Sequence, residues 1–229
     1  MNATQGGAVE MRPVVIVGPG GLGREVHELI EDINAAQPTW EVLGWLDSNA
    51  EMHGQRVHDL PVLGDLDWLA DRPEVAVVIG IGAPPTRRRV VERIRAQGNN
   101  KFPTLIHPTA VIGRRVEIGE GTIICAGVTT TTDYRIGKHV LLNICCTVAH
   151  DDVLHDFVTV APGALLSGNV TVGEGTDIGT NATIIQGVEI GGWSIVGAGS
   201  VVNKPVPDNV TAVGVPAKVI KERESGWQL

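Results

Sequence analysis

One histidine of the chain stands beside acidic residues in a pattern that suits proton transfer. His150 lies in the segment VAHDDV and is followed directly by Asp151. Histidine exchanges a proton near neutral pH, so it can serve as a general base, and an adjoining carboxylate orients the imidazole and raises its basicity. We therefore expect His150 to be a catalytic base with Asp151 as its partner. Asp152 and Asp156 are the alternative acids, and a surface histidine at a subunit seam is the alternative without chemistry.

A second group of residues suits phosphate binding. The segment GPGGLG, residues 18–23, has the G-x-G-x-x-G spacing, in which glycines let the backbone approach a phosphate at a helix N-terminus. Asp47 ends a later apolar run, where a carboxylate can reach a ribose hydroxyl. Both features fit a single nucleotide as well as NAD. Arg87 follows on an arginine-rich segment and is expected either to meet phosphate or to lie on a solvated helix face.

The glycine-rich loop needs a strand before it and a helix after it, and the first hundred residues alternate in that way. Apolar runs predict strands over Pro13–Val17, Trp40–Leu46 and Val75–Gly80. Helical patterns cover residues 24–36 and Thr86–Gln97. This βαβ order predicts a small parallel sheet with room for about one nucleotide-binding half, which is too short for the two-halved dinucleotide fold.

His150 belongs to a six-residue repeat that fills the second half of the chain. From Ile106 to Val202, seventeen successive hexads begin with an aliphatic residue, apart from Thr130. The fifth position of each hexad is mostly small, so every short strand has two inward side chains, and glycine permits the corners. Three such strands close a triangular coil, which gives about 5.7 coils stacked as a solenoid. His150, at a third position, is expected to face outward.

Composition and charge exclude several classes of protein. Glycine is frequent, at 29 residues, while Trp, Phe and Tyr number only 5, 2 and 1, which fits short strands with tight corners. The 18 basic and 26 acidic residues leave a net charge of −8 and no basic patch for a nucleic acid. No apolar run reaches the ~18 residues of a membrane span, and the first residues lack the features of a signal peptide. The three cysteines favour a reducing cytoplasm over a disulfide framework.

The hexads resemble those of the left-handed β-helix acyltransferases, and residues 214–220, GVPAKVI, are similar to that family's ending. In the first half, the segments GPGGLGREV, WLDS, IGIGAPPTRRR and LIHPTAVIG occur in the order seen in bacterial sugar-nucleotide acetyltransferases. Over roughly residues 13 to 221 the chain therefore resembles the bacillosamine and perosamine N-acetyltransferases. The sialic acid O-acetyltransferases are more distant relatives.

This resemblance implies a cytoplasmic homotrimer whose active sites lie between subunits. Acetyl-CoA would lie in the groove between neighbouring β-helices, no metal would be needed, and neither nucleic acid nor membrane would be a partner. The acceptor would be the amino group of a nucleotide-linked 4-amino-4,6-dideoxy sugar, used in polysaccharide biosynthesis, with UDP, GDP and dTDP all open. His150 would take the proton, because a sugar amine is mostly ammonium near neutral pH.

The resemblance also implies the residues of both binding sites. Leu22 stands where many relatives have histidine, and Thr159 stands where the bacillosamine branch has a second histidine near the thioester carbonyl. The hydroxyl or N–H of Thr159 would hydrogen-bond that oxygen as charge develops on it. The expected sugar-nucleotide residues are Gly20, Gly21, Leu22, Asp47, Ser48 and Gly82. The expected acetyl-CoA residues are Thr159, Thr180, Gly197 and Ala198.

Other functions stay open as alternatives. A sugar O-acetyltransferase would use the same residues, and an NAD-binding or scaffolding β-helix protein would leave the His150–Asp151 pair without a role. A zinc enzyme of the γ-class carbonic anhydrase kind would bind metal through His150 and His155, which have the required spacing of five. Its third ligand is expected at position 114, which is Arg114.

The expected domain order has four parts. A disordered lead over residues 1–12 is followed by a Rossmann-like α/β sugar-nucleotide-binding domain with a small parallel sheet over residues 13–105. A left-handed parallel β-helix of hexapeptide repeats then covers residues 106–207, and a C-terminal tail covers residues 208–229.

Overall fold

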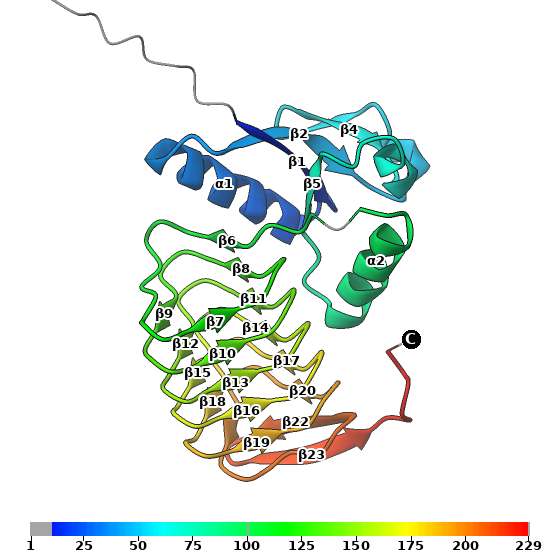
Figure 1. The fold of residues 1–229 in the computed structure, drawn as a ribbon. Coiled ribbons are helices and arrows are strands. Elements are labelled where there is room, and N and C mark those ends of the chain that lie inside the picture. Colours follow the sequence, from blue (N-terminus) through cyan, green and yellow to red (C-terminus); the bar gives the residue numbers. More distant parts are fainter. Residues whose placement is uncertain (1–10, 100, 229) are drawn as a thin grey trace, which may run out of the picture.

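A small α/β domain stands on one end of a column of short strands in the computed structural model, which describes residues 11–99 and 101–228 (Figure 1). The first ten residues of the expected disordered lead lie outside the described part, and Arg12 already belongs to a strand. Among the described residues, no helix is both long and apolar enough to cross a membrane.

The α/β domain has a five-stranded sheet in the order β3-β4-β2-β1-β5. Strands β1, β2, β4 and β5 are parallel, and β3 pairs antiparallel with β4. The apolar runs form strands because β-branched and other apolar side chains fill both faces of the sheet. The bounds are β1 (Arg12–Val17), α1 (Gly21–Ala36), β2 (Trp40–Leu46), a 3-10 turn (Ala50–Met52), β3 (Arg56–Val57), β4 (Leu60–Gly64), a second 3-10 turn (Leu66–Leu69), β5 (Ala76–Ile79) and α2 (Pro84–Ala96).

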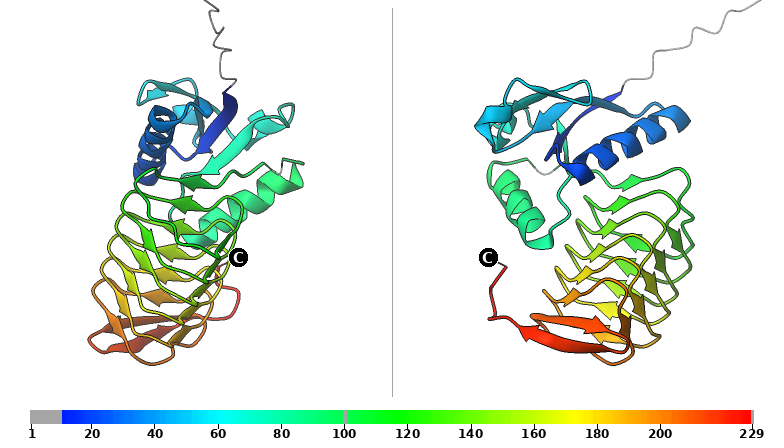
Figure 2. Two further views of the ribbon diagram at one scale, coloured as in Figure 1. Left: turned by 60° about the vertical axis from the view of Figure 1, so that its left-hand side comes forward. Right: turned by 180° about the vertical axis from the view of Figure 1, so that it is seen from behind.

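The two helices cover opposite faces of this sheet. Val14 and Ile16 pack in one cluster with α1, whereas Val15 and Val17 pack in another with α2. The cluster beneath α1 continues into outward side chains of the first coils, so the domain is seated on the column through apolar contacts. Figure 2 shows α1 lying across the end of the column and α2 standing beside it.

The second half is a left-handed parallel β-helix whose strands pair at intervals of 18 residues. Arg135 of β10, for example, pairs with Glu117 of β7 above it and with Val153 of β13 below it. The predicted coil of three hexads is therefore confirmed. Its two-residue strands are β6 (Leu105–Ile106), β7 (Glu117–Ile118), β8 (Ile123–Ile124), β9 (Thr129–Thr130), β10 (Arg135–Ile136), β11 (Leu141–Leu142), β12 (Thr147–Val148), β13 (Val153–Leu154), β14 (Thr159–Val160), β15 (Leu165–Leu166), β16 (Thr171–Val172), β17 (Asp177–Ile178), β18 (Thr183–Ile184), β19 (Glu189–Ile190), β20 (Ile195–Val196) and β21 (Val201–Val202).

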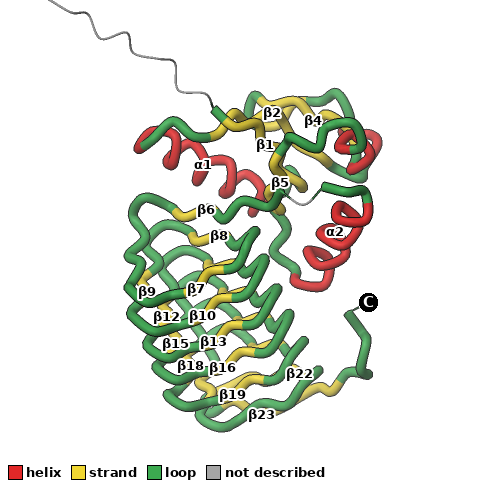
Figure 3. The backbone as a smooth tube through the Cα atoms, viewed as in Figure 1, coloured by secondary structure: helices red, strands yellow, loops and turns green. Residues whose placement is uncertain are grey.

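The column ends in a hairpin of β22 (Val210–Gly214) and β23 (Ala217–Glu222), whose strands are antiparallel. The last residues then run back along the outside of the column toward α2, as both views in Figure 2 show. The tube drawing makes clear that most of the column is loop, with strands only two residues long on each side (Figure 3).

The three sheets of the column differ in what their outer faces carry. The covered sheet (β6, β8, β11, β14, β17, β20, β22 and β23) begins with outward Leu105, Ile123 and Leu141, which pack beneath the α/β domain. The charged sheet (β7, β10, β13, β16 and β19) presents Glu117, Arg135 and Glu189 outward. The uncharged sheet (β9, β12, β15, β18 and β21) has no charged residue at an outward strand position: these are Thr129, Thr147, Leu165, Thr183 and Val201.

The corners use the left-handed backbone conformation, and glycine is not its only source. His139 and Phe157 occupy equivalent positions one coil apart, with φ of 53° and 60°. Their rings stack at a centroid distance of 5.3 Å, and Phe102 meets His139 edge-on. His139 is fully enclosed, and burial together with the nearby Arg95 charge lowers its pKa to about 4.

We predict that His139 makes the fold sensitive to acid. Because its folded pKa lies below the ordinary value of about 6.5, the stability that neutral His139 contributes is complete above that value. It is lost as the pH falls through about 4, by up to roughly 3 kcal/mol. Unfolding free energies measured by denaturant titration from pH 7 to pH 4 should fall less steeply for His139→Phe, a side chain that position 157 already accommodates.

The matched control is His155→Gln, which changes an exposed histidine on the adjoining coil. It should keep the slope of the natural chain. Equal slopes for the natural chain and His139→Phe would contradict a buried neutral imidazole.

Candidate functional site

A pocket opens where the parallel strands of the α/β domain end. It has a volume of about 310 Å³ and lies between the ends of β1 and β2 and the exposed side of α2. The carboxyl ends of parallel strands are where this class of fold binds ligands, because loops diverge there and backbone groups are free. Asp47 and Ser48, both expected from the sequence, line this pocket together with Gly18.

The glycine-rich loop is shaped by close packing and leaves the start of α1 open. A Cβ on Gly23 would lie 1.8 Å from the Gly18 carbonyl oxygen, and one on Gly80 would lie 2.6 Å from the Gly23 Cα. These two glycines therefore let helix, loop and β5 approach one another. Gly20 and Gly21 face open space, and no side chain caps the first N–H groups of α1. Such an uncapped helix start, with no acidic residue in its first turn, favours an anion.

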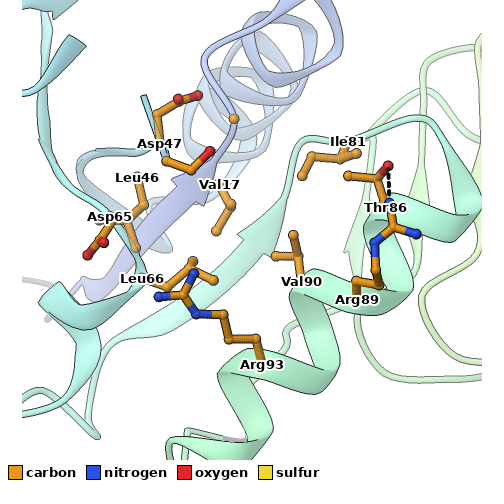
Figure 4. A pocket seen from close by; sticks show the side chains of 12 residues that line it. Val17, Leu46, Asp47, Asp65, Leu66, Ile81, Thr86, Arg89, Val90 and Arg93 are labelled. Carbon is orange, nitrogen blue, oxygen red and sulfur yellow. Dashed lines mark hydrogen bonds between the residues drawn. The ribbon is translucent and has the colours of Figure 1, made fainter. Parts of the chain in front are cut away.

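The pocket carries opposite charges on its two sides. Asp47 and Asp65 come from the sheet side, and Arg89 and Arg93 come from α2, as Figure 4 shows. The side chain of Asp47 accepts a hydrogen bond from the Asn49 N–H at 2.7 Å. No role was expected for Asp65, Arg89 or Arg93. Arg89 ends the segment IGIGAPPTRRR, but the three residues come together only in the folded chain. Of the expected residues, Gly20, Gly21, Leu22 and Gly82 flank the pocket and do not line it.

Arg87 joins this loop region to the column and does not face solvent or the pocket. Its guanidinium is buried and donates to the carbonyl oxygens of Ile81 and Gly82 on one side. On the other side it donates to His139 O at 2.9 Å and Phe157 O at 2.7 Å. Burial lowers its pKa to about 10. Both expectations for Arg87, phosphate contact and a solvated face, are wrong because the helix face that carries it is covered by the column.

Thr159 belongs to the same junction. Its hydroxyl donates to Gly82 O at 3.0 Å and accepts from Arg87 at 3.0 Å, while its backbone N–H donates to Thr176 O at 2.9 Å. Neither donor is free for a thioester oxygen, contrary to the role expected from the sequence. The side chain is instead buried between the column and the loop after β5.

His150 lies at a corner between the uncharged and charged sheets, in the turn from β12 to β13. Its side chain is about half exposed, and Nδ1 lies 2.8 Å from Asp151 Oδ2. The ring rests on Gly168 of the next coil, where a Cβ would lie 2.4 Å from Nε2. The carboxylate and the glycine together orient the imidazole, so that Nε2 is the nitrogen left for chemistry. Gly168 was not expected, and the signal for it is its position 18 residues after His150.

The two alternative acids have other roles. Asp152 is completely buried, and its carboxylate accepts from the N–H groups of Ala149 and Val170, both at 2.8 Å. Burial raises its pKa to about 6, against the effect of those two hydrogen bonds. Asp156 accepts from the Lys138 N–H at 2.7 Å. Asp152 thus holds the turn that carries His150, and only Asp151 contacts the ring.

The residues expected to contact acetyl-CoA lie at a different corner. Thr180 and Ala198 are exposed one above the other, in the turns that lead from the covered sheet to the uncharged sheet. Gly197 lies beside them, where a Cβ would meet Val213 at 2.6 Å, so its glycine is required by the packing of β22. Because His150 stands at the next corner of the triangle, one chain does not bring these residues to a common site.

The zinc alternative finds no set of ligands in residues 11–99 and 101–228. No three His, Cys, Asp or Glu side chains are grouped there so that they could hold a metal ion. Two of the thiols, on Cys125 and Cys146, are buried, and burial raises the pKa of each to about 12.

Comparison with known proteins extends this description. Residues 13–94 match the family described as the PglD N-terminal domain. The UDP-N-acetylbacillosamine N-acetyltransferase of Bacillus subtilis is 40% identical over 118 residues, which is 51% of this chain and 52% of that protein. The matched part thus spans about half the length of this curated relative.

Two solved structures are similar over nearly the whole chain. The acetyltransferase domain of PglB from Neisseria gonorrhoeae, in complex with acetyl coenzyme A, has a TM-score of 0.84 and 32% identity, covering 92% of this chain and 100% of that one. PerB from Caulobacter crescentus, in complex with CoA and GDP-perosamine, has a TM-score of 0.83 and 33% identity, covering 94% of this chain and 100% of that one.

We predict that Arg87 is the residue on which the junction between domain and column depends. Arg87→Ala would leave buried carbonyl oxygens without donors, and should lower the free energy of unfolding by about 3 kcal/mol or more. Denaturant titration followed by tryptophan fluorescence measures this change. Arg88→Ala removes partly exposed ion pairs with Glu92 and Glu174 and a contact with the Trp193 ring, but leaves no buried carbonyl without a donor, and should cost only about 1 kcal/mol. Similar losses of unfolding free energy for the two variants would contradict the prediction that the buried hydrogen bonds of Arg87 stabilise the junction.

Proposed function

This chain belongs to the hexapeptide-repeat acetyltransferases of the bacillosamine and perosamine N-acetyltransferase type, and from that premise we propose that it acetylates a nucleotide-linked amino sugar with acetyl-CoA. The acceptor is the amino group of a 4-amino-4,6-dideoxy sugar carried on a nucleoside diphosphate. The observation that carries the proposal is the His150–Asp151 pair, half exposed on a corner of the column, in a chain whose glycine-rich loop leads into the uncapped start of a helix.

The nucleotide is assigned to the pocket at the ends of β1 and β2. The uncapped start of α1, at Gly20 and Gly21, favours the diphosphate, and Arg89 and Arg93 on α2 add positive charge on the opposite side. Asp47 lines the pocket beside the loop, where its carboxylate can accept hydrogen bonds from ribose hydroxyl groups. Ser48 is the next residue and lines the same pocket.

Leu22 and Gly82 form the apolar edge of this loop. A Cβ on Gly82 would lie 3.7 Å from the Leu22 side chain, so the two residues are neighbours across the loop entrance. Leucine offers no hydrogen bond there, and the polar contacts to the nucleotide are therefore left to the backbone of the loop and to Asp47 and Ser48.

His150 acts as the general base in this proposal. Nε2 accepts a proton from the sugar ammonium or from the nitrogen as it attacks, while Asp151, hydrogen-bonded to Nδ1, stabilises the imidazolium that forms. The amine nitrogen bonds to the acetyl carbonyl carbon, the carbon–sulfur bond breaks, and CoA leaves as its thiol after taking a proton. Two features position the histidine for this role. Buried Asp152 stabilises the turn that carries it, and Gly168 leaves room for the ring on the next coil.

A second copy of the chain completes the site. His150 and the pair Thr180–Ala198 stand at different corners of one column, so they can share a substrate only if a neighbouring column brings its own corner alongside. The uncharged sheet joins these two corners and exposes Leu165, of which 45% is accessible, with threonines and valine around it. This face suits burial against another copy, and we assign it to the interface of a homotrimer.

The decisive test of the proposed activity follows thiol release from acetyl-CoA in the presence of UDP-, GDP- and dTDP-linked 4-amino-4,6-dideoxy sugars. With the accepted sugar, His150→Asn should lower kcat by roughly 10²–10⁴-fold at pH 7, because the amine then lacks a base. The defect should shrink as the pH rises, since more of the amine arrives unprotonated. Asp151→Asn should cost less, and asparagine suits the left-handed backbone of that position, where φ is 61°.

A kcat near that of the natural chain for His150→Asn at pH 7 would contradict the general-base role. The product is identified by mass spectrometry and by its stability to mild alkali, which separates an N-acetyl from an O-acetyl group.

The interface assignment predicts that Leu165→Glu disrupts the trimer. Light scattering coupled to size exclusion should find three copies of the 24.2 kDa chain in the natural protein and a smaller species for the variant, with loss of acetyl transfer. The matched control is Thr171→Glu, which adds the same charge on the neighbouring charged sheet and should leave the trimer intact. A natural chain that is monomeric and fully active would contradict a site shared between copies.

A further inference from the structure

A second cavity lies between the start of α2 and the covered sheet, and no step above uses it. Its volume is about 380 Å³. The walls come from three parts of the chain that are far apart in sequence: the loop and first turn of α2, outward residues of the covered sheet, and the C-terminal segment. The lining residues that matter below are Thr86, Arg89, Asp177, Ile195 and Trp227.

Asp177 is the acidic group of this cavity. It takes the outward position of β17, directly below Thr159 in the covered sheet, and four other coils have leucine or isoleucine at this position. No residue within 11–99 and 101–228 donates a hydrogen bond to its carboxylate. The Arg87 charge acts on it without a direct ion pair, and burial raises its pKa. A half-buried carboxylate without donors is costly, so its oxygens are available to donors that a ligand supplies.

The cavity adjoins the nucleotide pocket. Thr86 and Arg89 line both, so a molecule that lies in one pocket and extends past Arg89 enters the other. Arg89 donates to the Thr86 hydroxyl and to the Gln228 carbonyl oxygen at 3.0 Å, which ties the C-terminal segment to α2 at this boundary. A diphosphate placed at Arg89 therefore has its nucleoside on one side and its second substituent on the other.

The remaining walls are apolar. Ile195 lies one coil below Asp177, Pro84 and Pro85 form the start of α2, and Trp227 closes the side formed by the C-terminal segment. The tryptophan is held by Arg223, whose guanidinium lies 4.7 Å from the ring centroid. An aromatic ring and a carboxylate that line one cavity suit a sugar ring, whose hydroxyl edge is polar and whose C–H face is apolar.

We propose that this cavity is the sugar subsite, in which Asp177 accepts hydrogen bonds from hydroxyl groups of the sugar and Trp227 covers its apolar face, while the amino group stays free for His150. The inference rests on the proposed function for the identity of the ligand, and it adds the residues that recognise the sugar. The apolar walls at Ile195 and the two prolines suit the methyl group of a 6-deoxy sugar. Thr180, in the turn two residues after the end of β17, lies at the corner assigned to acetyl-CoA, so that corner is close in the chain to the cavity wall formed by Asp177.

The test measures what the sugar adds to nucleotide affinity, without acetyl-CoA present. Dissociation constants are determined by calorimetry for GDP, UDP and dTDP, and for the 4-amino-4,6-dideoxy sugar linked to each of them, with GDP-perosamine as the GDP-linked sugar. For the natural chain, the accepted nucleotide sugar should bind more tightly than its nucleoside diphosphate. Asp177→Asn should raise the dissociation constant of the nucleotide sugar by about ten-fold or more. It should change the dissociation constant of the nucleoside diphosphate by less than about two-fold.

Two further variants keep the test independent of folding defects. Trp227 lies on the C-terminal segment, and Trp227→Ala should selectively weaken the binding of the nucleotide sugar. Trp227→Phe should keep most of the affinity of the natural chain. Glu189→Gln, an outward carboxylate of the charged sheet, is the matched control and should change neither constant. Thermal unfolding of each variant confirms that the junction around Arg87 is intact.

The outcomes separate this inference from the proposed function. Equal effects of Asp177→Asn on nucleotide sugar and nucleoside diphosphate, or no gain from the sugar in the natural chain, overturn the subsite. Selective loss of sugar affinity in a chain that transfers no acetyl group would support the subsite and overturn the proposed reaction. Acetyl transfer by Asp177→Asn with unchanged sugar affinity and rate would support the proposed reaction and overturn the subsite.

Discussion

The buried guanidinium of Arg87 is the interaction on which the arrangement of this molecule depends. It carries a full charge into the buried junction and is surrounded by carbonyl oxygens from the loop after β5 and from two successive corners of the column. Each carbonyl supplies a partial negative charge, so several of them together offset part of the desolvation cost of one cation. These directional hydrogen bonds fix the position of the glycine-rich loop relative to the β-helix. Apolar packing or a flexible linker would allow a wider range of relative positions.

This junction also explains why two cavities meet at α2. Arg87 and Thr159 hold one face of the helix against the covered sheet, while the exposed side of the helix presents Arg89 and Arg93 to the nucleotide pocket. The same attachment leaves a gap below Thr159, at Asp177, where the helix start no longer covers the sheet. A nucleotide on the sheet side and a sugar on the column side would therefore share one boundary, at Thr86 and Arg89.

The column contributes a different kind of constraint. Every coil repeats the same strands, so function is confined to the corners and to the outward strand positions, where a residue can change without disturbing the buried hexad side chains. His150 uses one corner, and a small residue one coil below it gives the ring its place. Because the corners of one triangle point in different directions, reactive residues on two corners meet only between columns. Assembly is thus part of the proposed chemistry, and the uncharged sheet is the surface that offers it.

The sequence alone determined the features that depend on local spacing. The hexads from Ile106 onward predict coils of 18 residues because an inward aliphatic side chain is needed on every side of the triangle, and the strand pairing confirms this. The glycine-rich loop and the pairing of His150 with Asp151 could also be predicted from the sequence, because the residues involved are close together in the chain. The tertiary structure decided what depends on contacts across long separations: Arg87 with the column, Arg89 and Arg93 beside Asp47, and Asp177 beneath α2. An arginine on an amphipathic helix looks the same in sequence whether it meets water, phosphate or backbone carbonyls, because only the packing of the helix decides which of them it can reach.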